Sequence, residues 1–209
     1  MRADTLFNSR EKELIAAQVR EVELRTSGEV AVMVVDESDS YPEGQLLAGV
    51  VLGGLLALAL TDFFLANDLW LFVPLALGLT ALCGWLSAYL PALHRLFIPA
   101  ARLEQQVAEQ ALIGFYQKGL HQTREATGVL FFISLFERKV RVLADRGIYE
   151  KISQETLQGY AADVARGIKS GRAAEALCRE IERVGTILAE HFPRREDDSN
   201  ELSDEVIVG

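Results

Sequence analysis

The chain has 209 residues, of which 50% are hydrophobic, and a formal net charge of −9. This acidic balance argues against nucleic acid as a partner, because a phosphate-binding protein needs a basic face. It also argues against a polybasic patch that docks onto anionic lipid heads, and the distant cysteines Cys83 and Cys178 form no zinc or redox motif.

The first predicted elements are a helix and a strand. Asn8 or Ser9 can cap a helix that continues to about Arg25, because Glu11 follows Asn8 by three residues and apolar side chains recur at helical spacing. Residues 29–35, EVAVMVV, are apolar on both faces, as in a strand that is covered on both sides. One helix and one strand cannot bury a core alone, so this piece needs partners from elsewhere in the chain.

Two long apolar segments follow, in a stretch without Lys or Arg between Arg25 and Arg95. Residues 46–60 carry no polar side chain, and residues 69–90 carry no charge. The second segment is long enough to cross a hydrocarbon core of about 30 Å. A protein of this size cannot surround two helices that are apolar all round. We therefore predict a transmembrane helical hairpin over residues 45–93.

Charge predicts how the hairpin is oriented. Arg95 and Arg102 follow the second apolar segment, whereas the tip between the segments carries Asp62 and Asp68 and no positive charge. The positive-inside rule then predicts two membrane passes with both chain ends in the cytoplasm. No ionisable side chain lies in the middle of either segment, which argues against a transporter.

Small residues line one face of each apolar segment. They are Gly49 and Gly53 in the first segment, and Thr80, Gly84 and Ala88 in the second. Such faces let helices approach closely. We expect them to pack the hairpin on itself, and a homodimer through the hairpin is the alternative.

The elements predicted after the hairpin are a long amphipathic helix, two strands joined by a tight turn, and two further helices. They cover residues 101–121, 129–136, 140–144, 153–168 and 174–188. The first of these strands is apolar on both faces and is predicted to be central. The tail, residues 194–209, is acidic and without periodicity, so we predict that it is disordered.

The two flanks are predicted to form one α/β domain. Its first part is residues 1–44 and its second part is residues 94–193. The hairpin at residues 45–93 is inserted in a loop of this domain. A loop accepts such an insertion when the two ends of the insertion lie close together, as the ends of antiparallel membrane helices do.

Two stretches resemble the signatures of the TPM-domain family. They are TSGEVAVMVVDESDSYPE at residues 26–43 and TGVLFFISLFERKVRVLADRGIYEKIS at residues 127–153. The resemblance implies a small mixed sheet sandwiched between helices. The chain is most similar to the bacterial subgroup that has an internal transmembrane hairpin, which implies a place in the bacterial inner (plasma) membrane.

Acidic residues follow two of the predicted strands. Asp36, Glu37 and Asp39 come after the first strand, and Asp145 and Glu150 come after the third. Loops that leave strand ends often bind ligands, and Ca²⁺ prefers carboxylate and carbonyl oxygens. Some members of the family resemble calcium binders with weak phosphatase activity. The resemblance therefore implies that this acidic cluster is a candidate Ca²⁺ site. The alternative is a solvated juxtamembrane linker that charge keeps off the lipid.

The sequence contains no recognisable catalytic motif. It has no nucleophile elbow, P-loop, dinucleotide fingerprint or H-E-x-x-H zinc motif, and its three histidines are isolated. We expect a non-enzymatic, membrane-anchored cytoplasmic TPM-like domain that binds or helps to maintain other membrane proteins. The alternative is a Ca²⁺-binding, phosphatase-like hydrolase that uses the loop carboxylates.

Overall fold

The computed structural model describes residues 2–64, 69–123, 125–194 and 205–208, and it divides into two compact units. One unit consists of residues 1–38 and 105–209, and we call it the sheet unit. The other consists of residues 39–104, and we call it the hairpin unit.

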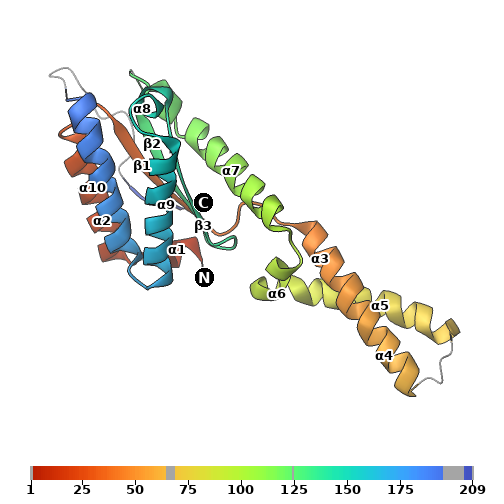
Figure 1. The fold of residues 1–209 in the computed structure, drawn as a ribbon. Coiled ribbons are helices and arrows are strands. Elements are labelled where there is room, and N and C mark those ends of the chain that lie inside the picture. The colour runs from red at the N-terminus through yellow and green to blue at the C-terminus, as the bar shows by residue number, and fades with distance from the viewer. Residues whose placement is uncertain (1, 65–68, 124, 195–204, 209) are drawn as a thin grey trace. The chain divides into compact units, whose positions relative to one another are not determined.

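A four-stranded mixed sheet, in the order β3-β2-β1-β4, forms the centre of the sheet unit (Figure 1). β1 (Glu29–Val35) pairs parallel with β2 (Gly128–Ser134) along all 7 residues. β2 pairs antiparallel with β3 (Lys139–Ala144), and β4 (Ile207–Val208) pairs parallel with β1. The mixed sheet among helices is confirmed.

Helices cover both faces of this sheet (Figure 1). On one face lie α2 (Ser9–Glu23), α9 (Gln154–Lys169) and α10 (Ala173–His191), and on the other lies α7 (Ala100–Gln117), of which residues 105–117 belong to the sheet unit. The short helices α1 (Ala3–Leu6), α8 (Arg146–Tyr149) and the 3₁₀ turn η2 (Leu120–Gln122) complete the unit.

Side-chain caps fix where two of the long helices begin. Asn8 Oδ1 accepts a hydrogen bond from the Glu11 N–H at 2.9 Å, and Glu11 Oε2 accepts one from the Asn8 N–H at 2.8 Å. This reciprocal capping box satisfies donors that a helix start leaves open. It confirms Asn8, rather than Ser9, as the cap. Ser153 caps α9 in the same way, by accepting from the Thr156 N–H at 3.2 Å.

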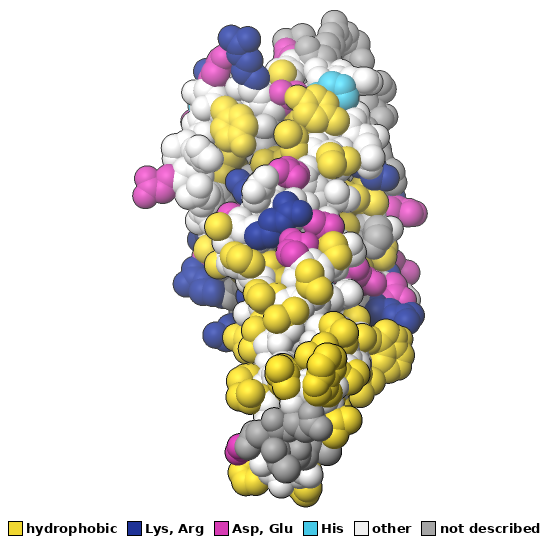
Figure 2. Space-filling view, turned by 90° about the vertical axis from the view of Figure 1, so that its right-hand side faces the viewer, with side chains coloured by type: hydrophobic (Ala, Val, Ile, Leu, Met, Phe, Trp, Pro, Cys, Tyr) yellow, Lys and Arg dark blue, Asp and Glu magenta, His cyan; other side chains and the backbone are white. Residues whose placement is uncertain are grey.

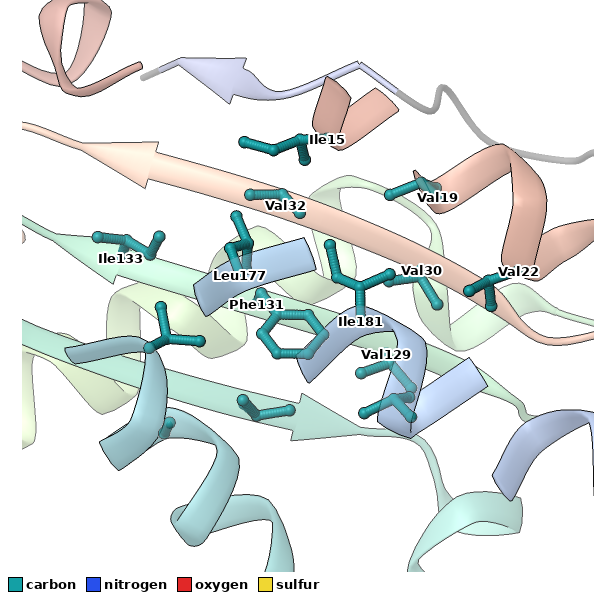
Figure 3. Packing of buried hydrophobic residues seen from close by; sticks show 14 of the residues in the cluster. Ile15, Val19, Val22, Val30, Val32, Val129, Phe131, Ile133, Leu177 and Ile181 are labelled. Atoms are coloured by element: carbon teal, nitrogen blue, oxygen red, sulfur yellow. The ribbon is translucent and has the colours of Figure 1, made fainter. Parts of the chain in front are cut away.

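Alternate residues of β1 belong to two different cores. Val30, Val32 and Val34 pack with α2, α9 and α10 in the larger core, which Figure 3 shows. Ala31, Met33 and Val35 pack with α7 in the smaller core. All seven side chains of β1 are buried, because successive residues of a strand point to opposite faces and helices cover both.

An ion-pair network joins α9 and α10, and its contribution to the stability of the fold depends on pH. The hydrogen bond from Arg166, helped by the charges of Arg166 and Arg183, holds the pKa of Asp163 below its ordinary value. A carboxylate with a lowered pKa stabilises the fold above its unfolded-state pKa, about 4, and loses that contribution as the pH falls through its folded-state pKa.

We therefore expect Asp163→Asn to lower the free energy of unfolding at pH 7 and to have a smaller effect at pH 3. The effect at pH 7 is small, because both arginine partners are exposed to solvent. Urea unfolding of the wild type and of Asp163→Asn at pH 7 and pH 3 measures this difference in the free energy of unfolding. A difference between the proteins that is as large at pH 3 as at pH 7 would contradict this assignment.

The tail departs from the predicted disorder at its described end. Ile207 and Val208 form β4, and Val206 and Ile207 contact the larger and the smaller core respectively. The prediction is wrong for these residues, because two residues are too few to show a strand's alternation and the edge of β1 supplies the pairing. Residues 195–204 of the predicted disordered tail lie outside the described residues.

The hairpin unit consists of two long apolar helical stretches and a short helix. The first stretch runs without a break through α3 (Pro42–Ala48), a π-helical turn, η1 (Gly49–Gly53), and α4 (Gly54–Phe64). The second is α5 (Leu69–Ala88), and α6 (Pro91–Leu96) follows it. The hairpin was predicted at residues 45–93, and the compact unit that contains it is wider.

Candidate functional site

Two helical stretches of the hairpin unit are long and apolar enough to cross a membrane. They are Pro42–Phe64, with 23 residues, and Leu69–Ala88, with 20 residues. The most apolar part of the second stretch has no buried residue. Figure 2 shows hydrophobic side chains gathered over these helices. Length and composition therefore make the hairpin the candidate for the membrane contact.

Small residues let the two stretches touch through their backbones. A Cβ on Gly49 would lie 2.5 Å from the Thr80 carbonyl oxygen, and a Cβ on Gly53 would lie 2.5 Å from the Thr80 nitrogen. Gly84 faces Gly49 and the Gln45 carbonyl in the same contact. These positions are filled within one hairpin, which is the packing that we expected from the sequence.

One of the small residues predicted for this face does not lie on it. Ala88 is exposed, whereas its neighbour Ser87 is fully buried and donates a hydrogen bond to the Gly84 carbonyl at 2.7 Å. A helix turns by about 100° per residue. A position seven residues after Thr80 therefore points almost the same way as Thr80, whereas a position eight residues after it has drifted by about 80°.

An ion pair closes the base of the hairpin unit. Arg102, near the start of α7, binds Asp39 at 3.0 Å and Glu43 at 3.1 Å. We call these three residues the hairpin clasp. The clasp joins the chain that enters α3 to the chain that leaves α6. Asp39, predicted as a metal ligand, is therefore engaged with a guanidinium group.

Beside the clasp, a buried tyrosine and a buried histidine hold the start of α3. Tyr41 is fully buried and adopts a left-handed conformation, with φ of 46°, immediately before Pro42. His94 Nε2 lies 3.0 Å from the Tyr41 carbonyl oxygen, and since a carbonyl can only accept, Nε2 donates. A Cβ on Gly44 would lie 2.7 Å from Ile98 and 3.0 Å from His94. His94 is therefore a packing and hydrogen-bonding residue.

A cavity of about 490 Å³ lies in the hairpin unit. Its lining residues are Leu55, Leu58, Ala59, Thr61, Asp62, Leu69 and Phe72. The hydroxyl of Thr61 is buried there and has no hydrogen-bond partner among the residues that the structure describes. The lining offers one hydroxyl and one carboxylate on apolar walls.

The structure does not gather the predicted acidic cluster. Asp36 follows the carboxyl end of β1, where its backbone carbonyl accepts from the Phe136 N–H at 2.9 Å. Asp145 follows β3, which runs antiparallel to β2, so it lies beside Gly128 at the other end of the sheet. A strand of 7 residues separates the two ends, about 20 Å at 3.3 Å per residue. One metal ion cannot bind both groups.

The predicted ligands in the sheet unit differ in their surroundings. Asp36 accepts a hydrogen bond from the Ala3 N–H, and exposed Glu37 follows it. Asp145 caps α8 by accepting from the Arg146 N–H at 2.7 Å, and Glu150 lies 3.7 Å from the Arg146 guanidinium in an exposed ion pair. Among the residues that the structure describes, no three His, Cys, Asp or Glu side chains are placed to hold a metal ion.

A buried carboxylate that the sequence did not single out lies at the carboxyl ends of β1 and β2. Glu137 is fully buried in the turn between β2 and β3. Its Oε1 accepts from the Ser38 N–H at 2.8 Å, and its Oε2 accepts from the Ser134 hydroxyl. The Ser38 hydroxyl donates to Ser134 Oγ at 3.0 Å. This network, which we call the Glu137 network, fixes the chain at the last residue of the sheet unit before the hairpin unit begins.

Comparison with known proteins identifies the fold. Residues 96–187 match the family model described as the TPM domain. The NMR structure of the BA42 protein from the psychrophilic bacterium Bizionia argentinensis is similar, with a TM-score of 0.60 and 18% identity over 97% of this chain and 95% of that chain. Among curated proteins, none matches the chain. The likeness to BA42 concerns the fold alone.

Proposed function

We propose that the hairpin unit anchors the TPM-like domain, of which residues 96–187 match the family model, to a membrane. In this proposal the domain is a non-enzymatic interaction or maintenance factor for other membrane proteins. The membrane is the bacterial inner membrane, crossed twice, with both chain ends in the cytoplasm. The hairpin can also contact a second copy, as a homodimer, through faces other than the glycine contact.

The observation that carries the proposal is where the exposed large hydrophobic side chains lie. Most of those among the described residues belong to the hairpin unit. The remainder are Leu14, Leu24, Leu112, Ile113, Tyr116, Tyr149 and Val208. A soluble protein rarely exposes so large an apolar surface, and a bilayer would cover it.

Aromatic residues at both ends of α5 support the same proposal. Trp70 lies near its start, and Trp85 and Tyr89 lie near its end, with their rings in an edge-to-face contact at 5.0 Å. Tryptophan and tyrosine are enriched at the two interfaces of a membrane. Arg95 follows on the side that we assign to the cytoplasm, whereas the charge of Arg102 is offset by the clasp.

The non-enzymatic assignment rests on the contacts that the predicted carboxylate ligands make. Asp36, Asp39 and Asp145 each hold a backbone or ion-pair contact, and Asp36 and Asp145 lie at opposite ends of the sheet. We therefore expect the purified full chain to hydrolyse no phosphate ester, with or without Ca²⁺. Metal-dependent turnover that disappears in both Asp36→Asn and Asp145→Asn would overturn the non-enzymatic assignment.

Partner binding is tested by photo-cross-linking in living bacteria. Leu112 and Tyr116 lie on the exposed apolar side of α7, so a photoreactive amino acid at either position should capture a membrane protein. The same amino acid at Ala162, an exposed position of α9, is the control. Capture of the same protein from all three positions, or of none, would contradict a specific partner.

A further inference from the structure

The cavity of the hairpin unit, which we call the tip groove, lies between the end of α4 and the start of α5. All seven of its lining residues belong to the described part of the chain. Three of them, Leu55, Leu58 and Leu69, are exposed large hydrophobic side chains. The tip groove therefore opens on the outer surface of the two helices, and in a membrane-spanning hairpin its occupant would enter from the lipid.

The polar groups of the tip groove lie at one end of it. Asp62 follows Leu55 by 7 residues of the same helical stretch, which is about 10 Å along the axis at 1.5 Å per residue. Thr61 and Asp62 lie close to Phe64, where α4 ends, whereas Leu55 and Leu58 lie deeper in the hairpin. The end of a membrane-spanning helix lies at the level of the lipid head groups. The tip groove thus has the polarity of one lipid molecule, polar at the membrane face and apolar below it.

Thr61 brings a buried hydroxyl to the tip groove. The residue is only 6% exposed, and its Oγ1 has no hydrogen-bond partner within the ranges that the structure describes. A buried hydroxyl without a partner costs free energy, because it has lost its bonds to water and gained none. A ligand oxygen that accepts a hydrogen bond from Thr61 would remove this cost, and the ester and phosphate oxygens of a phospholipid are acceptors of this kind.

Asp62 determines the charge of the ligand. It is an exposed residue of the lining, and the sequence contains no Lys or Arg between Arg25 and Arg95. Arg95 comes after α5, whose 20 residues are about 30 Å long at 1.5 Å per residue. A carboxylate with no basic residue nearby attracts a cation and repels an anion. One carboxylate and one hydroxyl are too few ligands for Ca²⁺, which takes about 6–8 oxygens.

We propose that the tip groove binds a phospholipid whose head group ends in a primary ammonium, that is, phosphatidylethanolamine. The ammonium donates to Asp62, an ester or phosphate oxygen accepts from Thr61, and an acyl chain lies along Leu55 and Leu58. A primary ammonium has three N–H donors, whereas the quaternary ammonium of choline has none, so Asp62 distinguishes the two head groups. This inference rests on the proposed membrane anchoring and adds that the hairpin selects one of the lipids around it.

The test is native mass spectrometry of the full chain, released from detergent micelles that contain equal amounts of phosphatidylethanolamine, phosphatidylcholine and phosphatidylglycerol. We expect the wild type to retain phosphatidylethanolamine about fivefold more than either other lipid, because only this head group donates charged hydrogen bonds to Asp62. Asp62→Asn should abolish the preference. Asp4→Asn removes the same charge from an exposed position in the sheet unit, so this control should keep the preference.

Two further variants test the rest of the tip groove. Leu58→Trp fills it with a larger side chain and should lower the retention of all three lipids. Leu56→Trp is the matched control, because Leu56 is an exposed residue of α4 that does not line the groove. Thr61→Val keeps the shape of the side chain and removes the hydroxyl. It should lower the retention of all three lipids alike, since each of them has ester and phosphate oxygens.

Equal retention of the three lipids by the wild type, or a preference that survives in Asp62→Asn, would overturn the proposal, as would preferential retention of phosphatidylglycerol. A wild-type dimer that Leu58→Trp disrupts, measured by analytical ultracentrifugation, would assign the tip groove to a second copy and overturn it as well. Flotation of the full chain with phosphatidylcholine vesicles tests the anchoring separately. Flotation without a lipid preference would refute the tip groove alone, whereas a chain that does not float would refute the proposed function.

Discussion

Gly53→Ala will separate the two helices of the hairpin. The added Cβ would lie 2.5 Å from the Thr80 nitrogen and 2.6 Å from the Leu79 carbonyl carbon. Both are backbone atoms, which cannot move aside as a flexible side chain can. Overpacking of this kind typically costs about 1–3 kcal/mol. The expected result is a hairpin that unfolds at a lower temperature than the wild type.

The adjacent glycine provides a matched control. Gly54 is in the same helical stretch, and a Cβ there would meet nothing within 4 Å. Gly54→Ala therefore has the same helix propensity gain without the clash. Thermal unfolding in lipid nanodiscs, followed by the fluorescence of Trp70 and Trp85, reports on α5 because the chain has only these two tryptophans. Equal midpoints for the two alanine variants would contradict the backbone contact.

Glu137→Ala will destabilise the sheet unit more than any exposed acidic substitution. It removes the acceptor of the Ser38 N–H and of the Ser134 hydroxyl in a fully buried site. A buried donor that loses its partner costs about 1–3 kcal/mol. Glu137→Gln keeps one acceptor oxygen, so its loss should be intermediate.

Glu150→Ala is the matched control for this experiment. Glu150 makes an exposed ion pair with Arg146, at 3.7 Å, and such pairs contribute little. Urea unfolding followed by far-ultraviolet circular dichroism compares the three variants. Hydrogen exchange at the Ser38 amide should also speed up in Glu137→Ala. A variant at Glu137 that is as stable as Glu150→Ala would show that the Glu137 network does not hold the loop.

The elements of the fold that follow from local pattern could be predicted from the sequence. Asn8 and Glu11 at the right spacing mark the start of α2, and the doubly apolar run at residues 29–35 marks β1 as a central strand. Both features are set by residues that lie close together in the sequence, so the sequence alone shows them. The parallel direction in which β1 pairs with β2 was not predicted, because no local pattern sets it.

Contacts between distant residues could not be predicted in the same way. Asp39 and Arg102 lie on opposite sides of the hairpin in sequence, and Ser38 is far from Glu137. No local spacing links such residues. β4 was missed for a different reason, since a strand of 2 residues has no period to detect and depends on the edge that it pairs with.

The predicted acidic cluster failed to assemble because of how the strands are connected and paired. A tight turn at residues 135–138 reverses the chain between β2 and β3. Because β1 pairs parallel with β2, the end of β3 lies at the opposite end of the sheet from the end of β1. Asp145 and Glu150 therefore could not join Asp36 and Glu37, whatever the family resemblance implied about calcium.

The measurement that tests the central claim most directly is the membrane depth of Trp70 and Trp85. The two residues lie on α5, about 22 Å apart along the axis at 1.5 Å per residue. In vesicles, the single-tryptophan variants Trp70→Phe and Trp85→Phe are compared with lipids brominated at different depths and with an impermeant aqueous quencher. A hairpin that spans the bilayer places the two tryptophans near opposite faces, so the aqueous quencher added outside reaches only one of them. Equal depth on the same face, or full quenching of both from the water, would contradict a membrane-spanning hairpin.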